Sequence, residues 1–206
     1  MYSCQVDSAR TPGQRAGLSR AAVLAAAREV LAESGVQAMT MRTLARRLGV
    51  APNALYSHVA NRPALLEDLL DDLLASIEAP AADEGDPVAG LVELMTSTYD
   101  VLTGHPDLVP LYLARQGARG PNAVHLGQVM DALLTRAGVQ QDEVAPARQV
   151  LIVHAIGSAA FATGASTEPD LARPLSAVES RTTFARSLRW LLAGIVHSHD
   201  GSGHAG

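Results

Sequence analysis

Apolar residues recur along most of this chain at intervals of three and four, which is the period of a helix with one buried face. The first such stripe consists of Val23, Ala27, Val30 and Leu31. Ser19 is placed to cap this helix and Gly35 to end it, so the pattern predicts a helix over residues 19–34.

Two shorter apolar patterns follow, and only Gly49 and Val50 separate them. The patterns predict one helix over residues 40–48 and another over residues 51–59. A turn containing glycine between two short helices is the layout that places the second helix in a DNA major groove. Helices this short are unstable alone, so the preceding helix is expected to cover them.

The rest of the chain keeps the helical period, and no strand pattern or internal repeat interrupts it. Further helices are predicted over residues 61–77, 87–103, 106–116, 121–138, 142–164 and 177–197. The predicted fold class is therefore all-α, with an N-terminal helix-turn-helix domain followed by a C-terminal helical bundle. The predicted domains are a flexible arm (1–17), the helix-turn-helix domain (18–65), the bundle (66–197) and a flexible tail (198–206).

Three segments of the N-terminal part carry a family resemblance: LSRAAVLAAAREVLAESG, TMRTLARRLGV and ALYSHVANRPALLEDLL. Together they resemble the DNA-binding domain of the TetR family of transcriptional regulators. The resemblance implies a repressor that binds a palindromic operator as a homodimer and leaves it when a small molecule binds. Two positions depart from the family pattern: Ala51 replaces a Ser or Thr helix cap, and Arg62 replaces a lysine.

The resemblance also implies which side chains meet double-stranded operator DNA. The expected set is Thr40, Arg42, Pro52, Asn53, Ala54, Tyr56, Ser57, His58 and Arg62. Thr40 and Arg62 are expected to reach phosphates at helix starts, where backbone N–H groups also attract anions. Arg42 is expected at a phosphate or a guanine edge.

Charge supports a DNA-binding N-terminal part, although the whole chain has a net charge of −5. Residues 1–65 contain eight arginines and three acidic residues, which gives +5, and the remainder of the chain carries −10. A basic domain on an acidic body orients itself on a phosphate backbone. The alternative is ordinary scatter of charge along the chain.

Other features restrict the class of protein. Cys4 is the single cysteine, which excludes an internal disulfide and a cysteine-based zinc cluster. Residues 1–17 lack the apolar core of a signal peptide. The apolar run at 150–162 is too short for a membrane span and is interrupted by His154. We therefore expect a cytoplasmic protein that does not contact a membrane.

The resemblance implies a dimer built from the two C-terminal helices, which pair with their symmetry mates in a four-helix bundle. The expected interface residues are Ile156, Gly157, Ala160, Leu188, Leu191 and Ile195. The alternative is that both helices form only the core of one protomer.

A ligand cavity is expected inside the bundle. Its candidate lining is Met95, Tyr99, Leu108, Tyr112, His125, Met130 and His154. This lining predicts a medium-sized, mostly apolar effector with a few polar groups. Ordinary core packing is the alternative explanation of the same residues.

No catalytic motif is visible: the chain has neither an HExxH pair nor a nucleophile elbow. We expect no enzymatic activity, no cofactor and no metal site. Two other classes stay open, namely an enzyme built on a helical bundle and a ligand-binding protein that has lost DNA binding.

Overall fold

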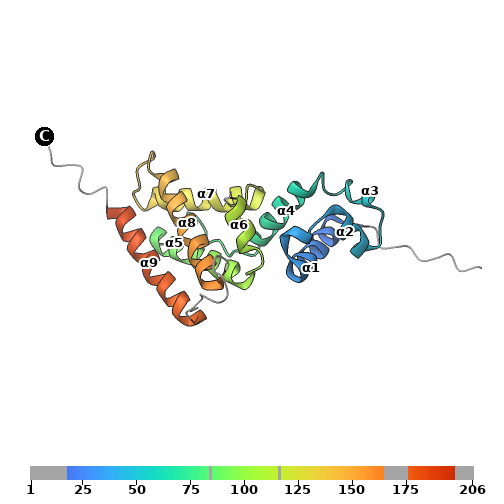
Figure 1. The fold of residues 1–206 in the computed structure, drawn as a ribbon. Coiled ribbons are helices and arrows are strands. Elements are labelled where there is room, and N and C mark those ends of the chain that lie inside the picture. Colours follow the sequence, from blue (N-terminus) through green and yellow to red (C-terminus); the bar gives the residue numbers. More distant parts are fainter. Residues whose placement is uncertain (1–17, 84, 116, 165–175, 198–206) are drawn as a thin grey trace, which may run out of the picture.

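The described part of the chain folds into helices and contains no strand, which confirms the predicted all-α class. The computed structural model describes residues 18–83, 85–115, 117–164 and 176–197, so the predicted arm and tail lie outside it. The helices are α1 (Arg20–Ala38), α2 (Met41–Leu48), α3 (Pro52–Leu55), α4 (Arg62–Leu74), α5 (Pro87–Gly104), α6 (Val109–Arg115), α7 (Pro121–Arg136), α8 (Val144–Thr163) and α9 (Ala177–His197). The molecule is elongated, with α1 to α3 at one end, α5 to α9 at the other, and α4 between them (Figure 1).

Local capping explains where the first two helices begin and end. The Ser19 side chain accepts a hydrogen bond from the Ala22 N–H at the start of α1 (3.1 Å). Thr40 caps α2, and Gly49 ends α2 in the left-handed region with a φ of 64°. Gly35 also has a positive φ of 72°, but it kinks α1 instead of ending it, so the helix runs beyond the predicted residue 34.

Helix α4 joins the two ends of the molecule and packs on both. The Asn61 side chain caps it by accepting a hydrogen bond from the Ala64 N–H (2.9 Å). Its leucine side is buried, with contacts to α1 at one end and to α7 at the other. The predicted domain boundary after residue 65 therefore falls inside a continuous helix, which can transmit a displacement between the two parts.

Helix α8 lies in the middle of the bundle and contacts α5, α6, α7 and α9. Among the described helices, it is the one long and apolar enough to cross a membrane. The sequence analysis expected the apolar run in this region to be too short for a span, and the length of the helix does not support that argument. One side of the helix packs into the bundle, and 33% of this apolar stretch is buried in the protomer. Leu151, Ala155 and Ala159 are fully buried, and Arg148 forms an ion pair with Asp131 of α7 (2.8 Å).

Candidate nucleic-acid interface and ligand cavity

Helices α2 and α3 are held at a fixed angle by a small apolar core. Buried in it are Met39, Leu44, Ala45, Leu55 and Val59, and α1 covers this core from behind. The opposite side of α3 and the turn that follows it are open to solvent, and they carry Pro52, Asn53, Ala54, Tyr56 and Ser57. Five of the nine predicted residues thus share one exposed surface, in the arrangement that lets a second helix enter a major groove.

Helix α3 is a single turn long, whereas the sequence predicts a helix as far as Val59. Ala51 stands at the N-cap and forms no side-chain hydrogen bond there. Beyond Leu55 the backbone tightens, because the N–H groups of His58 and Val59 both donate to the Leu55 carbonyl (2.9 and 3.0 Å). This turn leaves His58 half-buried, so it is less available to DNA than its exposed neighbours.

Three of the six described arginines of the N-terminal domain form ion pairs within the protein. Arg20 pairs with Asp68 (2.7 Å), Arg28 with Asp72, and Arg47 with both Glu29 (2.8 Å) and Glu33 (2.5 Å). Arg42 and Arg46 lie one turn apart on α2 and are exposed, and no acidic side chain of the described residues forms an ion pair with either. Fewer arginines are therefore available to phosphates than the sequence count indicates, and the available ones among the described residues lie on α2.

Arg62 does not reach outward as predicted. Its Nε donates to the Met39 carbonyl (2.5 Å) and its Nη2 to the Val36 carbonyl (2.6 Å), and the side chain is part-buried. These carbonyls belong to the end of α1, where a helix leaves acceptors unsatisfied. Contact with a phosphate would break both charge-assisted bonds, so the expectation of a phosphate ligand is replaced by that of a clamp between α1 and α4.

A cavity of about 150 Å³ lies in the bundle and is lined by residues of α4, α5, α6, α7 and α8. Of the predicted ligand residues, Met95, Tyr112 and Met130 line it. Thr98 and Ile152 also line it and were not among the predicted residues.

The other predicted ligand residues lie elsewhere. Tyr99 is buried outside the cavity and stacks on Phe184 with the ring centroids 4.3 Å apart. Leu108 is likewise a core residue outside the cavity. His125 is exposed on α7 and lines none of the described cavities, and His154 lines a separate groove between α8 and α9. Helical spacing alone placed these side chains together, whereas the packing of the helices separates them.

The cavity wall is hydrogen-bonded to α4, the helix that leads to the DNA-binding domain. The Tyr112 hydroxyl donates to the Leu70 carbonyl of α4 (2.6 Å). The buried carboxylate of Asp71 accepts from the Asn122 side chain at the start of α7 (2.9 Å). Burial, followed by the nearby carboxylates of Asp71 and Glu67, raises the pKa of Tyr112, so the phenol keeps its proton and remains a donor.

Comparison with known proteins agrees with this geometry. The sequence model described as "Bacterial regulatory proteins, tetR family" matches residues 23–69. An HTH-type transcriptional regulator of Saccharopolyspora erythraea is 30% identical over 141 residues, which cover 68% of this chain and 59% of that protein. The class A tetracycline repressor from transposon 1721 of Escherichia coli is 35% identical over 146 residues, covering 69% of this chain and 58% of the repressor. The chain belongs to the TetR family.

The chain spans about three fifths of the length of those two curated relatives. Solved structures of TetR-like proteins match more fully. BioQ with its double-stranded DNA operator has a TM-score of 0.69 at 26% identity, covering 87% of this chain and 99% of BioQ. A TetR variant from Acinetobacter baumannii AYE in complex with minocycline has a TM-score of 0.70 at 27% identity, covering 86% of this chain and 96% of that one. The similarity of fold therefore extends over both domains.

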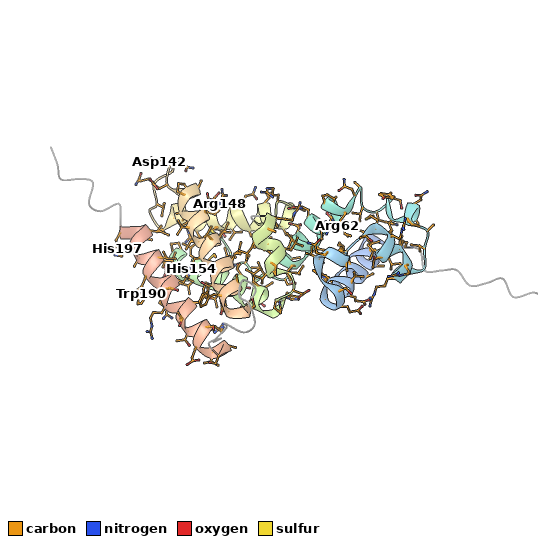
Figure 2. All side chains as sticks on the ribbon, in the orientation of Figure 1. Arg62, Asp142, Arg148, His154, Trp190 and His197 are labelled. Carbon is orange, nitrogen blue, oxygen red and sulfur yellow. The ribbon has the colours of Figure 1, made fainter. Side chains whose placement is uncertain are left out.

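In this TetR-family chain, α8 and α9 present large apolar side chains to solvent. Phe161 is 81% exposed, Val153 61% and Trp190 69%. Trp190 lies on α9 at the outer edge of the bundle (Figure 2). Val153, Gly157 and Phe161 recur at intervals of four on α8, so they form one continuous stripe.

One of the predicted dimer residues is exposed on this outer surface, and others are buried inside the protomer. Gly157 is exposed on it, as predicted. Ala160 and Leu188 are buried inside the protomer, and Ile156 lines the cavity, so these three are corrected to core or cavity positions. Leu191 and Ile195 are half-buried. The sequence did not reveal which apolar side of α8 faces outward, because that helix is apolar almost all round.

Between α8 and α9 this surface is hollowed by a groove of about 380 Å³. His154 lines it, is hydrogen-bonded to the Ser187 hydroxyl (3.0 Å) and stacks on Phe184 with centroids 5.1 Å apart. Burial lowers the pKa of His154, against a smaller opposing effect of a backbone hydrogen bond at Phe184. The imidazole is therefore neutral near pH 7.

Proposed function

We propose that this chain is a transcriptional repressor that binds a palindromic operator as a homodimer and is released by a small molecule. The observation that carries the proposal is the exposed surface of α2 and α3, where Arg42 and Arg46 stand beside the polar side of α3 on a buried apolar core. Such a surface combines phosphate anchors with side chains free to read base edges. The operator-bound structure of BioQ, which shares the fold over both domains, supports this assignment.

Dimerisation supplies the second half of the DNA-binding surface. One helix-turn-helix covers a single half-site, and two half-sites on one face of DNA lie about 34–36 Å apart. The exposed stripe of Val153, Gly157 and Phe161 on α8, together with Trp190 on α9, offers an apolar surface for a second copy. A second copy would remove these large side chains from water, which is the main driving force for association.

Release by a ligand requires a mechanical connection between the cavity and the DNA surface, and α4 provides one. Tyr112 lines the cavity and also holds the Leu70 carbonyl of α4. A ligand that prefers a displaced Tyr112 would shift α4 and, with it, the spacing of the two recognition helices. The coupling is reciprocal, so operator DNA weakens ligand binding by the same factor. The minocycline complex of a relative with the same fold supports a ligand in this domain.

A gel mobility shift with the DNA that precedes the chain's own gene tests the proposal. Asn53→Ala and Tyr56→Ala remove exposed side chains, so each is expected to weaken operator binding by about 1–3 kcal/mol. Gln128→Ala, at an exposed position on α7, is the matched control and is expected to bind like the unaltered protein. Normal operator binding by both α3 variants would contradict the assigned DNA surface.

Sedimentation tests the dimer independently. Phe161→Arg changes a side chain that is 81% exposed in the protomer, so the fold tolerates it. In the proposed dimer, the same change places an unpaired charge in a buried interface. We expect monomers and loss of operator binding, whereas a stable Phe161→Arg dimer would place the interface elsewhere.

A repressor of this kind acts where the chromosome is, so the proposal includes a cytoplasmic location.

A further inference from the structure

The size of the bundle cavity limits what can occupy it. Its volume is about 150 Å³, and its described lining is chiefly apolar, with side chains such as Met95, Leu126 and Ile156. In another protein, an engineered apolar cavity of about 150 Å³ binds benzene. A single ring therefore fits, whereas a fused system of several rings does not.

The side-chain hydroxyls of the lining are two, and both protons are already used. The Thr98 hydroxyl donates to the Leu94 carbonyl (2.8 Å), and the Tyr112 hydroxyl donates to the Leu70 carbonyl (2.6 Å). Each hydroxyl has one proton, so only its lone pairs remain. The Gly117 N–H is also committed, to the Tyr112 carbonyl (3.0 Å). The hydroxyl side chains of the cavity thus offer acceptors, and a ligand that binds to them must bring the donor.

Charge around the cavity disfavours anions. Among the described lining residues there is no arginine or lysine. The carboxylates of Asp71 and Glu67 act on the Tyr112 hydroxyl from α4, and Arg115 is engaged by Glu67 (2.8 Å). A carboxylate or phosphate entering the cavity would lose its hydration without gaining a donor or a cation, which is costly.

We propose that the cavity takes a neutral, single-ring-sized apolar molecule that carries one O–H or N–H donor. Phenol is the simplest example. Thr98 is the specificity residue, because its free lone pairs accept the donor of the ligand. The site is the effector site of the proposed repressor, so its regulatory consequence rests on that function, but the ligand class rests on the cavity alone. The proposed ligand is smaller than the medium-sized effector expected from the sequence.

Isothermal titration calorimetry on the full chain, with phenol, benzene, benzoate and minocycline as probes, tests the ligand class. We expect phenol to bind more tightly than benzene, and neither benzoate nor minocycline to bind in the same range. Thr98→Val removes one hydrogen-bond acceptor and keeps the shape, so phenol is expected to lose about fivefold in affinity while benzene is unchanged.

Ala123→Leu serves as a second variant, because Ala123 lines the cavity and its backbone N–H bond to Asp71 (3.0 Å) does not depend on the side chain. The larger side chain is expected to fill the cavity and abolish binding of both phenol and benzene. Three results would overturn the ligand class: benzoate or minocycline binding as tightly as phenol, an unaltered preference for phenol in Thr98→Val, or undiminished phenol binding by folded Ala123→Leu.

The ligand class and the proposed function fail in different ways. Phenol binding that follows the variants but leaves operator affinity unchanged supports the ligand class and contradicts the repressor switch. Operator binding by a protein that takes none of the probes contradicts the ligand class and leaves the DNA-binding function standing. The mobility shift and the calorimetry therefore decide the two questions separately.

Discussion

The pairing of arginines within the N-terminal domain makes a quantitative prediction about salt. Arg42→Gln and Arg46→Gln each remove an exposed cation from α2, on the proposed DNA surface. Arg28→Gln is the matched control, because Arg28 is held by Asp72 of α4. Glutamine keeps a long helix-forming side chain in all three variants, so the comparison isolates the charge.

The magnitude follows from counterion release. Each phosphate contact contributes about 0.9 to the slope of log affinity against log salt. A dimer uses each residue twice, so Arg42→Gln or Arg46→Gln is expected to reduce the slope by about 1.8. Between about 50 and 200 mM salt, the unaltered protein then loses roughly 12-fold more affinity than either variant. Arg28→Gln is expected to leave the slope unchanged.

Fluorescence anisotropy of a labelled operator, titrated at several salt concentrations, measures these slopes directly. Thermal unfolding of each variant checks that the domain stays folded. The reasoning would be refuted by a slope for Arg28→Gln that falls as much as that for Arg42→Gln. In that case, ion pairs within the protein would not prevent an arginine from meeting DNA. An unchanged slope in both α2 variants would remove α2 from the phosphate-contacting surface.

Three further predictions concern the bundle. A Cβ at Gly120 would stand 2.3 Å from the Asp71 Cγ, so Gly120→Ala is expected to lower the free energy of unfolding in urea by about 1–3 kcal/mol. Gly104→Ala meets nothing within 4 Å and is expected to have little effect. Gly157→Ala also meets nothing within 4 Å in the protomer, so it is expected to raise protomer stability by up to about 1 kcal/mol while weakening a closely packed dimer, as measured by thermal unfolding and by sedimentation at increasing dilution. Because the pKa of His154 is lowered by burial, the unfolded chain binds the proton first; stability is expected to fall as the pH drops below about 6.5, and His154→Gln should flatten this dependence in urea titrations.

Local sequence was sufficient to predict the helices and most of their ends. Ser19 was legible as a cap because a capping side chain bonds to a backbone N–H within the next three residues. Gly49 was legible as a left-handed turn residue for a similarly local reason. The residues expected to meet DNA came instead from the family resemblance, and the structure leaves Asn53, Tyr56 and Ser57 open to solvent.

The sequence by itself thus determined the all-α class, the helix-turn-helix and the residues around its turn, because those depend on contacts between near neighbours in the chain. Only the tertiary structure decided that Arg62 binds the carbonyls of Met39 and Val36, and that Arg28 is taken up by Asp72. It alone decided that Leu188 faces inward while Trp190 faces outward. These outcomes depend on which distant helices lie against one another, and the period of a single helix carries no information about its neighbours.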